Sequence, residues 1–366
     1  MPDRTFDIVK LAFRSPLHLS LGKPSLERSE EILHSDTLKS AIAVSAMKVT
    51  GMTPGTEQRF DPEFFHSFQV SSSFPYCEGE FFFPRPVSTR VLRGITLEGV
   101  RGVAKREKEL KKIRYLGRTF FEKLLSGQHF SLSHADRIAG GSMASDLFHQ
   151  YGKPEEVRPF RKREIRRVRV ARIGEVDEEG NALPPTPFYM QKIHFRQQAG
   201  LFFLLCPQAN FDEDLFKAAL RLLVDEGLGL NRHAGNGHFE AKQSSIHLNL
   251  PERGDQWMNL SLYCPQWNKE KGIQELDTEA LQDCSYQLIK RGGWIASPEE
   301  EQFLSFRKRS VFMFQEGSIF SFPESAPVPL IKGKCVNLQP DEGIRHDVLR
   351  DGRGIFFPVQ PSDHGV

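Results

Sequence analysis

The chain has 366 residues, of which 39% are hydrophobic and 26% charged, enough for about two globular domains with buried cores. The N-terminus lacks the layout of a signal peptide, and no apolar run approaches the roughly 20 residues of a membrane helix. The five cysteines are scattered without a C-x-x-C pair, which argues against a zinc site and a disulfide framework and fits a reducing cytoplasm.

The net charge of +2 conceals two strongly basic segments. Residues 101–118 carry eight Lys or Arg against two Glu, a net of +6, and residues 158–172 carry eight against one, a net of +7. Subtracting both from +2 leaves −11 for the rest of the chain. Such a concentration of positive charge predicts binding to a polyanion. The alternative is that both segments are solvated faces of ordinary helices or strands.

The first elements in the chain are predicted to be a strand and a helix. The apolar residues from Phe6 to Phe13 indicate a buried strand that ends before Pro16. A helix is expected to begin at Ser35 or Asp36, which are good N-cap residues. The start of this helix offers an anion site at Ser35, Asp36 and Thr37. The alternative is that these residues only cap the helix.

The following segments extend this pattern. FHSFQVSSSFPY and GEFFFPRP are typical of a strand and a hairpin arm. The first basic segment leads into KKIRYL, predicted as a strand with Lys111, Lys112 and Arg114 near its start, and RTFFEKLLSGQ predicts a helix. Strand, helix, strand, strand, helix is the opening of a ferredoxin-like unit. The less regular stretch that follows suggests an inserted hairpin or an arm, and the second basic segment contributes Arg166 and Arg167.

A second unit is expected from FYMQKIHF onward, with a further strand, a helix ending at Gly227, and the strand HFEAKQSSIHLNL. The predicted fold class is therefore α+β, with two ferredoxin-like (RRM-like) βαββαβ units. Residues 1–187 would form the first domain, with an inserted basic arm or thumb at about 129–187. Residues 188–366 would form the second, with a glycine-rich loop at 227–239.

The glycine-rich loop places Gly227, Gly229, Gly235 and Gly237 around three polar residues. These residues are Asn231, Arg232 and Asn236. The loop follows a helix and precedes a strand, and Arg232 stands where a third glycine would be, so the loop is not a dinucleotide fingerprint. A Walker-type G-K-[ST] is absent. Backbone N–H groups with little Cβ bulk around them would suit a phosphate backbone. A linker with helix-capping glycines is the alternative.

Seven motifs in order resemble those of a known family. They are FRSPLHL (residues 13–19), HSDTLKSAI (34–42), FPY…FFFPRP (74–86), KKIRYL (111–116), GLGLNRHAGNGHF (227–239), RGGWI (291–295) and EGSIF (316–320). Together they resemble the fourth subunit of the Csm complex, the type III-A CRISPR effector, within the RAMP superfamily. Each motif alone is weak, but the series covers nearly the whole chain.

The resemblance implies a guide-RNA-binding scaffold without catalytic residues, cofactor or metal. Its partners would be the 5′ repeat-derived handle of the CRISPR RNA, the large polymerase-like signalling subunit and the backbone subunit of the filament. Gly235, Asn236, Gly237 and His238 match the end of the family's glycine loop, and Arg232 its basic position. Ser35, Asp36 and Thr37 match the motif that opens its first helix. This chain departs from the family at His233-Ala234, where small hydroxyl residues are expected, and in its longer, arginine-rich segment 129–190.

A single-stranded RNA handle can be held by glycine loops, by Lys and Arg on phosphates and by planar side chains on splayed bases. The predicted RNA-binding residues are His18, Ser35, Asp36, Thr37, Lys111, Lys112, Arg114, Arg166, Arg167, Gly229, Asn231, Arg232, Gly235, Asn236, Gly237, His238 and Arg291. For His18, a hydrogen bond to nearby backbone in a turn is the alternative.

Related RAMP proteins are metal-independent endoribonucleases, so an enzyme is the second hypothesis. Cleavage of precursor CRISPR RNA would need a general base for the 2′-OH and an acid for the leaving oxygen. His18, His34, Lys39, His233 and His238 are the residues available for these roles.

Overall fold

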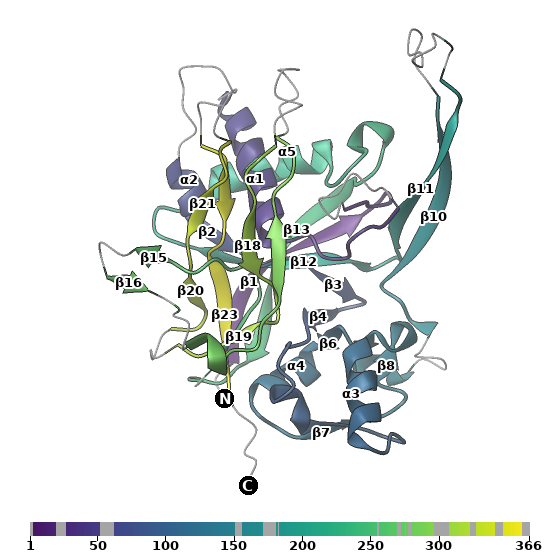
Figure 1. Cartoon of the computed structure of the whole chain (residues 1–366), viewed down its shortest axis with the longest axis vertical. Helices are drawn as coiled ribbons and strands as arrows, with labels where there is room; N and C mark the ends of the chain where they lie inside the picture. The colour runs from purple at the N-terminus through teal and green to yellow at the C-terminus, as the bar shows by residue number, and fades with distance from the viewer. Residues whose placement is uncertain are drawn as a thin grey trace.

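A nine-stranded, mostly antiparallel sheet runs through the molecule in the order β13-β1-β12-β3-β4-β6-β9-β8, with β2 paired to β12 (Figure 1). The computed structural model describes residues 3–19, 27–51, 62–150, 156–170, 181, 183–254, 256–268, 272–274, 276, 280–295, 307–322, 327–340 and 347–360. The strands of this sheet are β1 (Asp3–Phe13), β2 (Phe68–Val70), β3 (Phe74–Cys77), β4 (Glu80–Pro84), β6 (Tyr115–Gly117), β8 (Arg137–Ile138), β9 (Met143–Ala144), β12 (Ala199–Pro207) and β13 (Phe239–Asn249).

Strand β1 shows how the sheet separates two hydrophobic cores. Because successive side chains of a strand point to opposite faces, Val9 and Ile8 belong to different cores. Val9 packs under helices α1 (Ser35–Val49) and α5 (Glu213–Glu226), which lie on one face of the sheet. Ile8 faces the C-terminal part of the chain. A strand that is buried on both sides ties the two cores together, so β1 is central to the fold.

A second sheet, β19-β14-β23-β20, covers the other face of the nine-stranded sheet. The Phe6 ring of β1 lies 5.0 Å from the Phe357 ring of β23. The C-terminal elements are β14 (Gln256–Asn259), β15 (Trp267–Asn268), β16 (Ile273–Gln274), η6 (Ala280–Asp283), β17 (Leu288–Arg291), β18 (Val311–Phe314), β19 (Ile319–Phe320), β20 (Leu330–Lys332), β21 (Cys335–Asn337), β22 (Leu349–Asp351) and β23 (Gly354–Val359). In the part of the chain that the model describes, no helix is both long and apolar enough to cross a membrane.

The chain between β3 and β12 builds an inserted subdomain, drawn below the main sheet in Figure 1. Apart from the strands it adds to the sheet, its elements are η1 (Val91–Gly94), β5 (Ile95–Leu97), α3 (Val103–Lys112), α4 (Arg118–Leu125), β7 (Phe130–Leu132), η2 (Ala139–Gly141) and η3 (Leu147–Gln150). The predicted helix from Arg118 is confirmed as α4. The prediction of a strand beginning at Lys111 is wrong for its first residues, because Lys111 and Lys112 end helix α3. Only Tyr115–Gly117 are extended, as β6.

An arm hairpin of β10 (Phe160–Arg169) and β11 (Thr186–Phe195) projects from the body of the protein (Figure 1). The two strands pair antiparallel from Phe160 opposite Phe195 to Arg169 opposite Thr186. The arm predicted at about 129–187 thus begins some thirty residues later and includes β11. Residues 151–155, 171–180 and 182 of the predicted segment lie outside the described residues.

The nine-stranded sheet is continuous across the boundary predicted between residues 187 and 188. Strands β12 and β13, both assigned to the second domain, pair antiparallel with β1 of the first. Helix α1 contacts α5 on the same face of this sheet. The two predicted halves therefore share one sheet, and a division at residue 187 does not describe it. The fold is α+β, as predicted.

Candidate nucleic-acid interface

The glycine-rich loop joins α5 to β13 and folds back on the protein. The backbone N–H of Gly237 donates to Pro16 O at 2.9 Å, and that of Leu230 donates to His18 O at 2.9 Å. The N–H groups of Gly235 and Asn236 donate to carbonyls within the loop. The prediction that these N–H groups are free for phosphates is therefore wrong for Gly235, Asn236 and Gly237. The exposed tip of the loop is Arg232, His233, Ala234 and Gly235.

Two glycines of this loop adopt positive φ for different reasons. Gly237 has φ +74°, and a Cβ built there would lie 1.7 Å from Leu228 O. Gly235 has φ +75°, with no heavy atom within 4 Å of such a Cβ. We expect Gly237→Ala to destabilise the protein by roughly 3 kcal/mol or more and Gly235→Ala by about 1 kcal/mol, the cost of the left-handed backbone alone. Urea unfolding of both variants measures this, and equal losses would contradict the steric explanation.

A buried hydrogen bond fixes the loop to the arm. Lys192 Nζ of β11 donates to Asn236 Oδ1 at 2.7 Å, and Asn236 Nδ2 donates to Asn231 O at 3.1 Å. Lys192 and Asn236 are only 5% and 3% exposed. Burial, followed by the positive charge of Arg167, lowers the pKa of Lys192. Asn236 is therefore not available to read a base, contrary to the prediction. Its role is to hold the loop against the arm.

The pairing register of the arm places a set of basic side chains on one face. Opposite residues share a face and alternate along each strand. We call this set the arginine face: Arg161, Arg163, Arg167 and Arg169 of β10 with Lys192 and His194 of β11. The four arginines are exposed. Burial, then Arg163 and Lys192, lowers the pKa of His194, which reflects the positive potential here.

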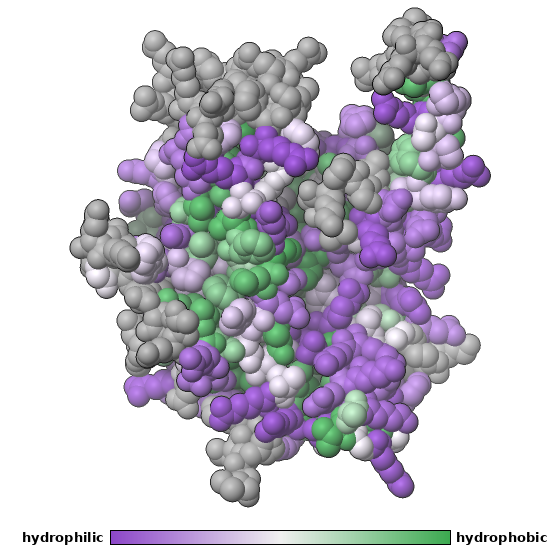
Figure 2. All heavy atoms as spheres, viewed as in Figure 1, coloured by the Kyte–Doolittle hydropathy of each residue, from purple (hydrophilic) through white to green (hydrophobic). Residues whose placement is uncertain are grey.

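Arg166 and Arg167 were both predicted to bind RNA, and the register separates them. Arg167 lies on the arginine face, whereas Arg166 pairs with Tyr189 on the opposite face. The arginine face continues into the loop through Lys192 and Asn236. Figure 2 shows mainly hydrophilic side chains over the arm and the subdomain below it, while hydrophobic ones gather over the C-terminal strands. Spacing of two residues within the basic segment is the signal that would have identified Arg161, Arg163 and Arg169.

A cavity of about 370 Å³ adjoins the base of the arm. Its lining includes Arg114 of the inserted subdomain with Arg158, Arg161 and Lys162. The carboxylate of Glu31 lies among these cations, 3.0 Å from Lys162 Nζ and in an ion pair with Arg114. Of the three basic residues predicted near KKIRYL, only Arg114 is therefore near the arm. Lys112 pairs instead with Glu109 at 2.6 Å on α3.

Of the residues predicted at the start of the first helix, Ser35 and Asp36 are buried and Thr37 is partly buried. Asp36 is fully buried in ion pairs with Arg291 at 2.9 Å and Arg350 at 2.8 Å. Arg291 also donates to Thr37 Oγ1 at 2.8 Å, and Ser35 Oγ accepts from Leu262 N at 2.9 Å. These side chains join α1 to the C-terminal strands. The prediction that these residues contact RNA is therefore wrong, because their side chains bind other parts of the protein in an internal ionic cluster.

His18 is also buried, and its Nδ1 lies 2.5 Å from the carbonyl oxygen of Gln191 on the arm. His18 is therefore not placed to contact RNA, and its partner is the arm, 173 positions away, rather than the nearby backbone of a turn. The remaining loop residues predicted to bind are closer to the surface. Arg232 is exposed, and its guanidinium lies 3.7 Å from the carboxylate of Glu226. His238 is half-buried, and its backbone N–H donates to Ser15 Oγ at 2.8 Å. Gly229 approaches His18 O so closely that a Cβ would lie 2.5 Å away.

His34 lies in a second buried ionic group beside α1. Its Nδ1 is 2.8 Å from Glu316 and its Nε2 is 3.4 Å from Glu30. Burial alone would lower the pKa of His34, but Glu316 and then Glu30 raise it to about 10. Because the pKa is raised in the folded protein, the charged imidazole contributes its full stabilisation at pH values below the unfolded pKa of 6.5. This contribution is lost as the pH rises to about 10.

We therefore expect His34→Gln to cost roughly 3 kcal/mol near pH 6 and progressively less between pH 7 and pH 10. Urea unfolding of both proteins over this pH range measures the difference. A loss that does not change with pH would show that His34 acts only by packing.

Within the described ranges, no three His, Cys, Asp or Glu side chains are grouped to hold a metal ion.

Comparison with known proteins identifies the C-terminal part. Residues 252–359 match the CRISPR Csm4 C-terminal domain. The chain is 24% identical over 270 residues to the CRISPR system Cms protein Csm4 of Thermococcus onnurineus, covering 72% of this chain and 76% of the relative. It is 22% identical over 393 residues to the protein of the same name from Methanocaldococcus jannaschii, covering 97% of each.

Solved structures share the fold over the whole chain. The Csm1-Csm4 cassette in complex with cA4 contains a chain with a TM-score of 0.58 and 18% identity, aligned over 99% of this chain and 100% of that one. A Csm3-Csm4 subcomplex of the type III-A interference complex contains one with a TM-score of 0.57 and 19% identity, aligned over 97% and 100%. The mostly antiparallel α+β fold and the matched domain define a CRISPR-associated protein. Within that class, residues 252–359 belong to the CRISPR Csm4 C-terminal domain family, and the chain as a whole is similar to Csm4 proteins.

Proposed function

We propose that this chain is a non-catalytic subunit of a type III-A CRISPR effector that holds the 5′ repeat-derived handle of the guide RNA. The observation that carries the proposal is the arginine face of the arm, which is joined to the glycine-rich loop by the buried Lys192–Asn236 hydrogen bond. Guanidinium groups suit phosphates because they present several donors in a planar fork. A line of exposed arginines beside a rigid loop therefore fits an RNA backbone.

The strand order supports an RRM-like unit of the RAMP type. The βαββαβ pattern is formed, in chain order, by β1, α1, the strand pair β2 and β3, β12, α5 and β13. In the sheet, these strands are ordered β13-β1-β12, with β2 and β3 both pairing with β12. The long insertion between β3 and β12 contains the subdomain and the arm. One unit is thus assembled from both predicted halves of the chain.

The environment of the candidate catalytic residues supports a binding role over the endoribonuclease alternative. His18 is buried under the arm, and His34 is held between two glutamates. Lys39 is 1% exposed, with Nζ 2.5 Å from Asp351. A general base must reach the 2′-OH of its substrate, and these three side chains are enclosed by protein. Of the five residues, only His233 is exposed at the loop tip.

The proposed protein partners are a large signalling subunit and a backbone subunit of the effector. The similar chains in the solved structures are named in complexes with Csm1 and with Csm3, which supports two protein partners. Exposed apolar side chains on the C-terminal hairpin β17–β18 support docking to another protein, because Leu288 is 52% and Phe312 is 62% exposed. The basic surfaces and this apolar hairpin lie on different elements, which would allow RNA and protein to bind together.

The proposal is tested by purifying the chain from cells that express a CRISPR array, both alone and with its genomic neighbours, and sequencing the RNA that copurifies. Guides that share a protected repeat-derived 5′ end, recovered with the other subunits, are the expected result. Trimming of a precursor at one repeat position by the chain alone would establish the endoribonuclease instead. Absence of RNA from both preparations would overturn the RNA-binding proposal.

A further inference from the structure

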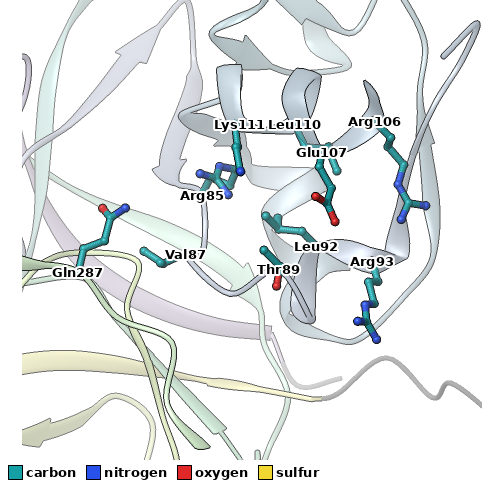
Figure 3. A pocket seen from close by; sticks show the side chains of 10 residues that line it. All are labelled: Arg85, Val87, Thr89, Leu92, Arg93, Arg106, Glu107, Leu110, Lys111 and Gln287. Atoms are coloured by element: carbon teal, nitrogen blue, oxygen red, sulfur yellow. The ribbon is translucent and has the colours of Figure 1, made fainter. Parts of the chain in front are cut away.

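A second cavity lies away from the arm, between the inserted subdomain and the segment that precedes β17. It has a volume of about 330 Å³, which is within the range of small-ligand sites. Its floor includes the buried side chains of Leu92 and Leu110, and Gln287 lines it from the C-terminal domain. Two parts of the chain thus enclose one space. Figure 3 shows the side chains that line it.

The charges around this cavity are strongly unbalanced. Four cations line it, Arg85, Arg93, Arg106 and Lys111, against the single carboxylate of Glu107. In Figure 3 the Lys111 ammonium extends from α3 toward the Arg85 guanidinium, whereas Arg93 and Arg106 lie beyond Glu107. Like charges directed toward one another repel, and an anion between them removes that repulsion.

None of the described residues supplies a counter-ion to the cations of the cavity. Across the residues that the model describes, none of the four has a carboxylate within ion-pair distance. On the same helix, by contrast, Lys112 pairs with Glu109. Nε of Arg106 is a buried donor without an acceptor. A buried charge-bearing group that the protein leaves unsatisfied is an expected feature of a ligand site.

Arg85 is held in place as part of the wall. Its Nε donates to Ile113 O at 2.8 Å and its Nη1 to Pro86 O at 2.9 Å. Burial lowers the pKa of Arg85, which shows the unfavourable environment of this charge in the absence of an anion. The guanidinium is therefore oriented before any ligand arrives, which lowers the entropy cost of binding.

We propose that this cavity binds a phosphate-bearing ligand, either a free nucleotide polyphosphate or the phosphates of an RNA strand. Arg85 and Lys111 would contact one phosphate, and the Gln287 amide would provide a further polar group from the C-terminal domain. The ligand would bridge the inserted subdomain and the C-terminal strands. This site is separate from the arginine face.

Isothermal titration of the full chain with sodium pyrophosphate, ATP and the dinucleotide ApA tests the proposal. Lys111→Gln is expected to weaken binding by roughly tenfold, the effect of one charge-assisted contact. Lys108→Gln is the matched control, because Lys108 is exposed on the same helix and does not line the cavity. It is expected to change binding by less than twofold.

The three probes distinguish the two sources of phosphate. Binding of pyrophosphate and ATP but not ApA identifies a free polyphosphate, and ApA binding that Lys111→Gln weakens identifies an RNA backbone. The weakening caused by Lys111→Gln should persist when it is measured in the Arg163→Glu/Arg167→Glu background, which removes phosphate binding by the arm, so this result is independent of the proposed guide-RNA function. The proposal is overturned if no probe binds at millimolar concentration, or if Lys108→Gln and Lys111→Gln weaken binding equally.

Discussion

Replacing Arg163 and Arg167 with glutamate is expected to lower the affinity for guide RNA about a hundredfold. Both side chains are exposed on the arginine face, beside the loop fixed by Lys192 and Asn236. A hydrogen bond to a charged group contributes about 1.5–3 kcal/mol, so two lost contacts remove 3 kcal/mol or more. The dependence of log K on log salt should also become shallower by about 1.4, since each phosphate contact to a single strand contributes about 0.7.

The control for this variant carries the same change of charge elsewhere. Arg166→Glu/Arg221→Glu alters the opposite face of the arm and an exposed position on α5. We expect it to weaken binding by less than tenfold, through the long-range field alone. Fluorescence anisotropy with a labelled handle RNA over a series of salt concentrations measures both quantities. If the control lost as much affinity as the double variant on the arginine face, the RNA would not lie on that face.

Asp36→Asn is expected to destabilise the fold by about 3–5 kcal/mol while leaving RNA affinity of the folded protein within twofold. Asp36 is fully buried between Arg291 and Arg350, and the variant would leave two guanidinium groups without their carboxylate. Burial alone would raise the pKa of Asp36, but Arg350 and then Arg291 hold it well below its usual range. The arginine face contains none of these residues, so binding should persist.

The pH dependence of this effect has a definite sign. A carboxyl whose pKa is depressed in the folded state stabilises the protein above its unfolded pKa of 3.8, and the contribution is lost as the pH falls toward the folded value. The difference between wild type and Asp36→Asn should therefore be constant above about pH 5 and shrink below pH 4. Urea unfolding measures it, with Asp214→Asn on the first turn of α5 as the control, expected to cost less than 1 kcal/mol. Equal stability of the two variants would refute the ionic cluster.

Local signals in the sequence predicted individual elements well. The helix predicted from Ser35 or Asp36 is confirmed as α1, but its N-cap is His34 without a side-chain cap hydrogen bond, so the capping role predicted for Ser35 or Asp36 is wrong. Gly227 marked the end of α5. The first basic segment was harder, because its charge was interpreted as a binding surface, whereas residues such as Ala104 and Leu110 in AKREKELKK favour the helix that forms. Local propensity predicted α1, α4 and α5, and it failed at Lys111 and Lys112, which end a helix where a strand was expected.

Long-range pairing explains what the sequence did not reveal. Asp36 has the residue type and position of a helix-terminal anion site or cap, but its partners Arg291 and Arg350 are 255 and 314 positions away. Likewise, the period-2 spacing of the arginines on β10 indicates that they share one face of a strand, but their position beside the glycine-rich loop follows only from the pairing of β10 with β11. The glycine loop was correctly placed between a helix and a strand, but the acceptors of its N–H groups, such as Pro16 O, come from the other end of the chain.

The position of β1 has a consequence for biosynthesis. Its partners are β12 and β13, and Asp3 lies opposite Asn249. After β1 is made, about 240 further residues, from Phe13 to Asn249, must therefore be made before both of its edges are fully covered. At about 5–20 residues per second, the wait is on the order of ten seconds or more. During translation, an apolar strand with two open edges is a binding site for chaperones, and translation rate should affect the yield of folded protein.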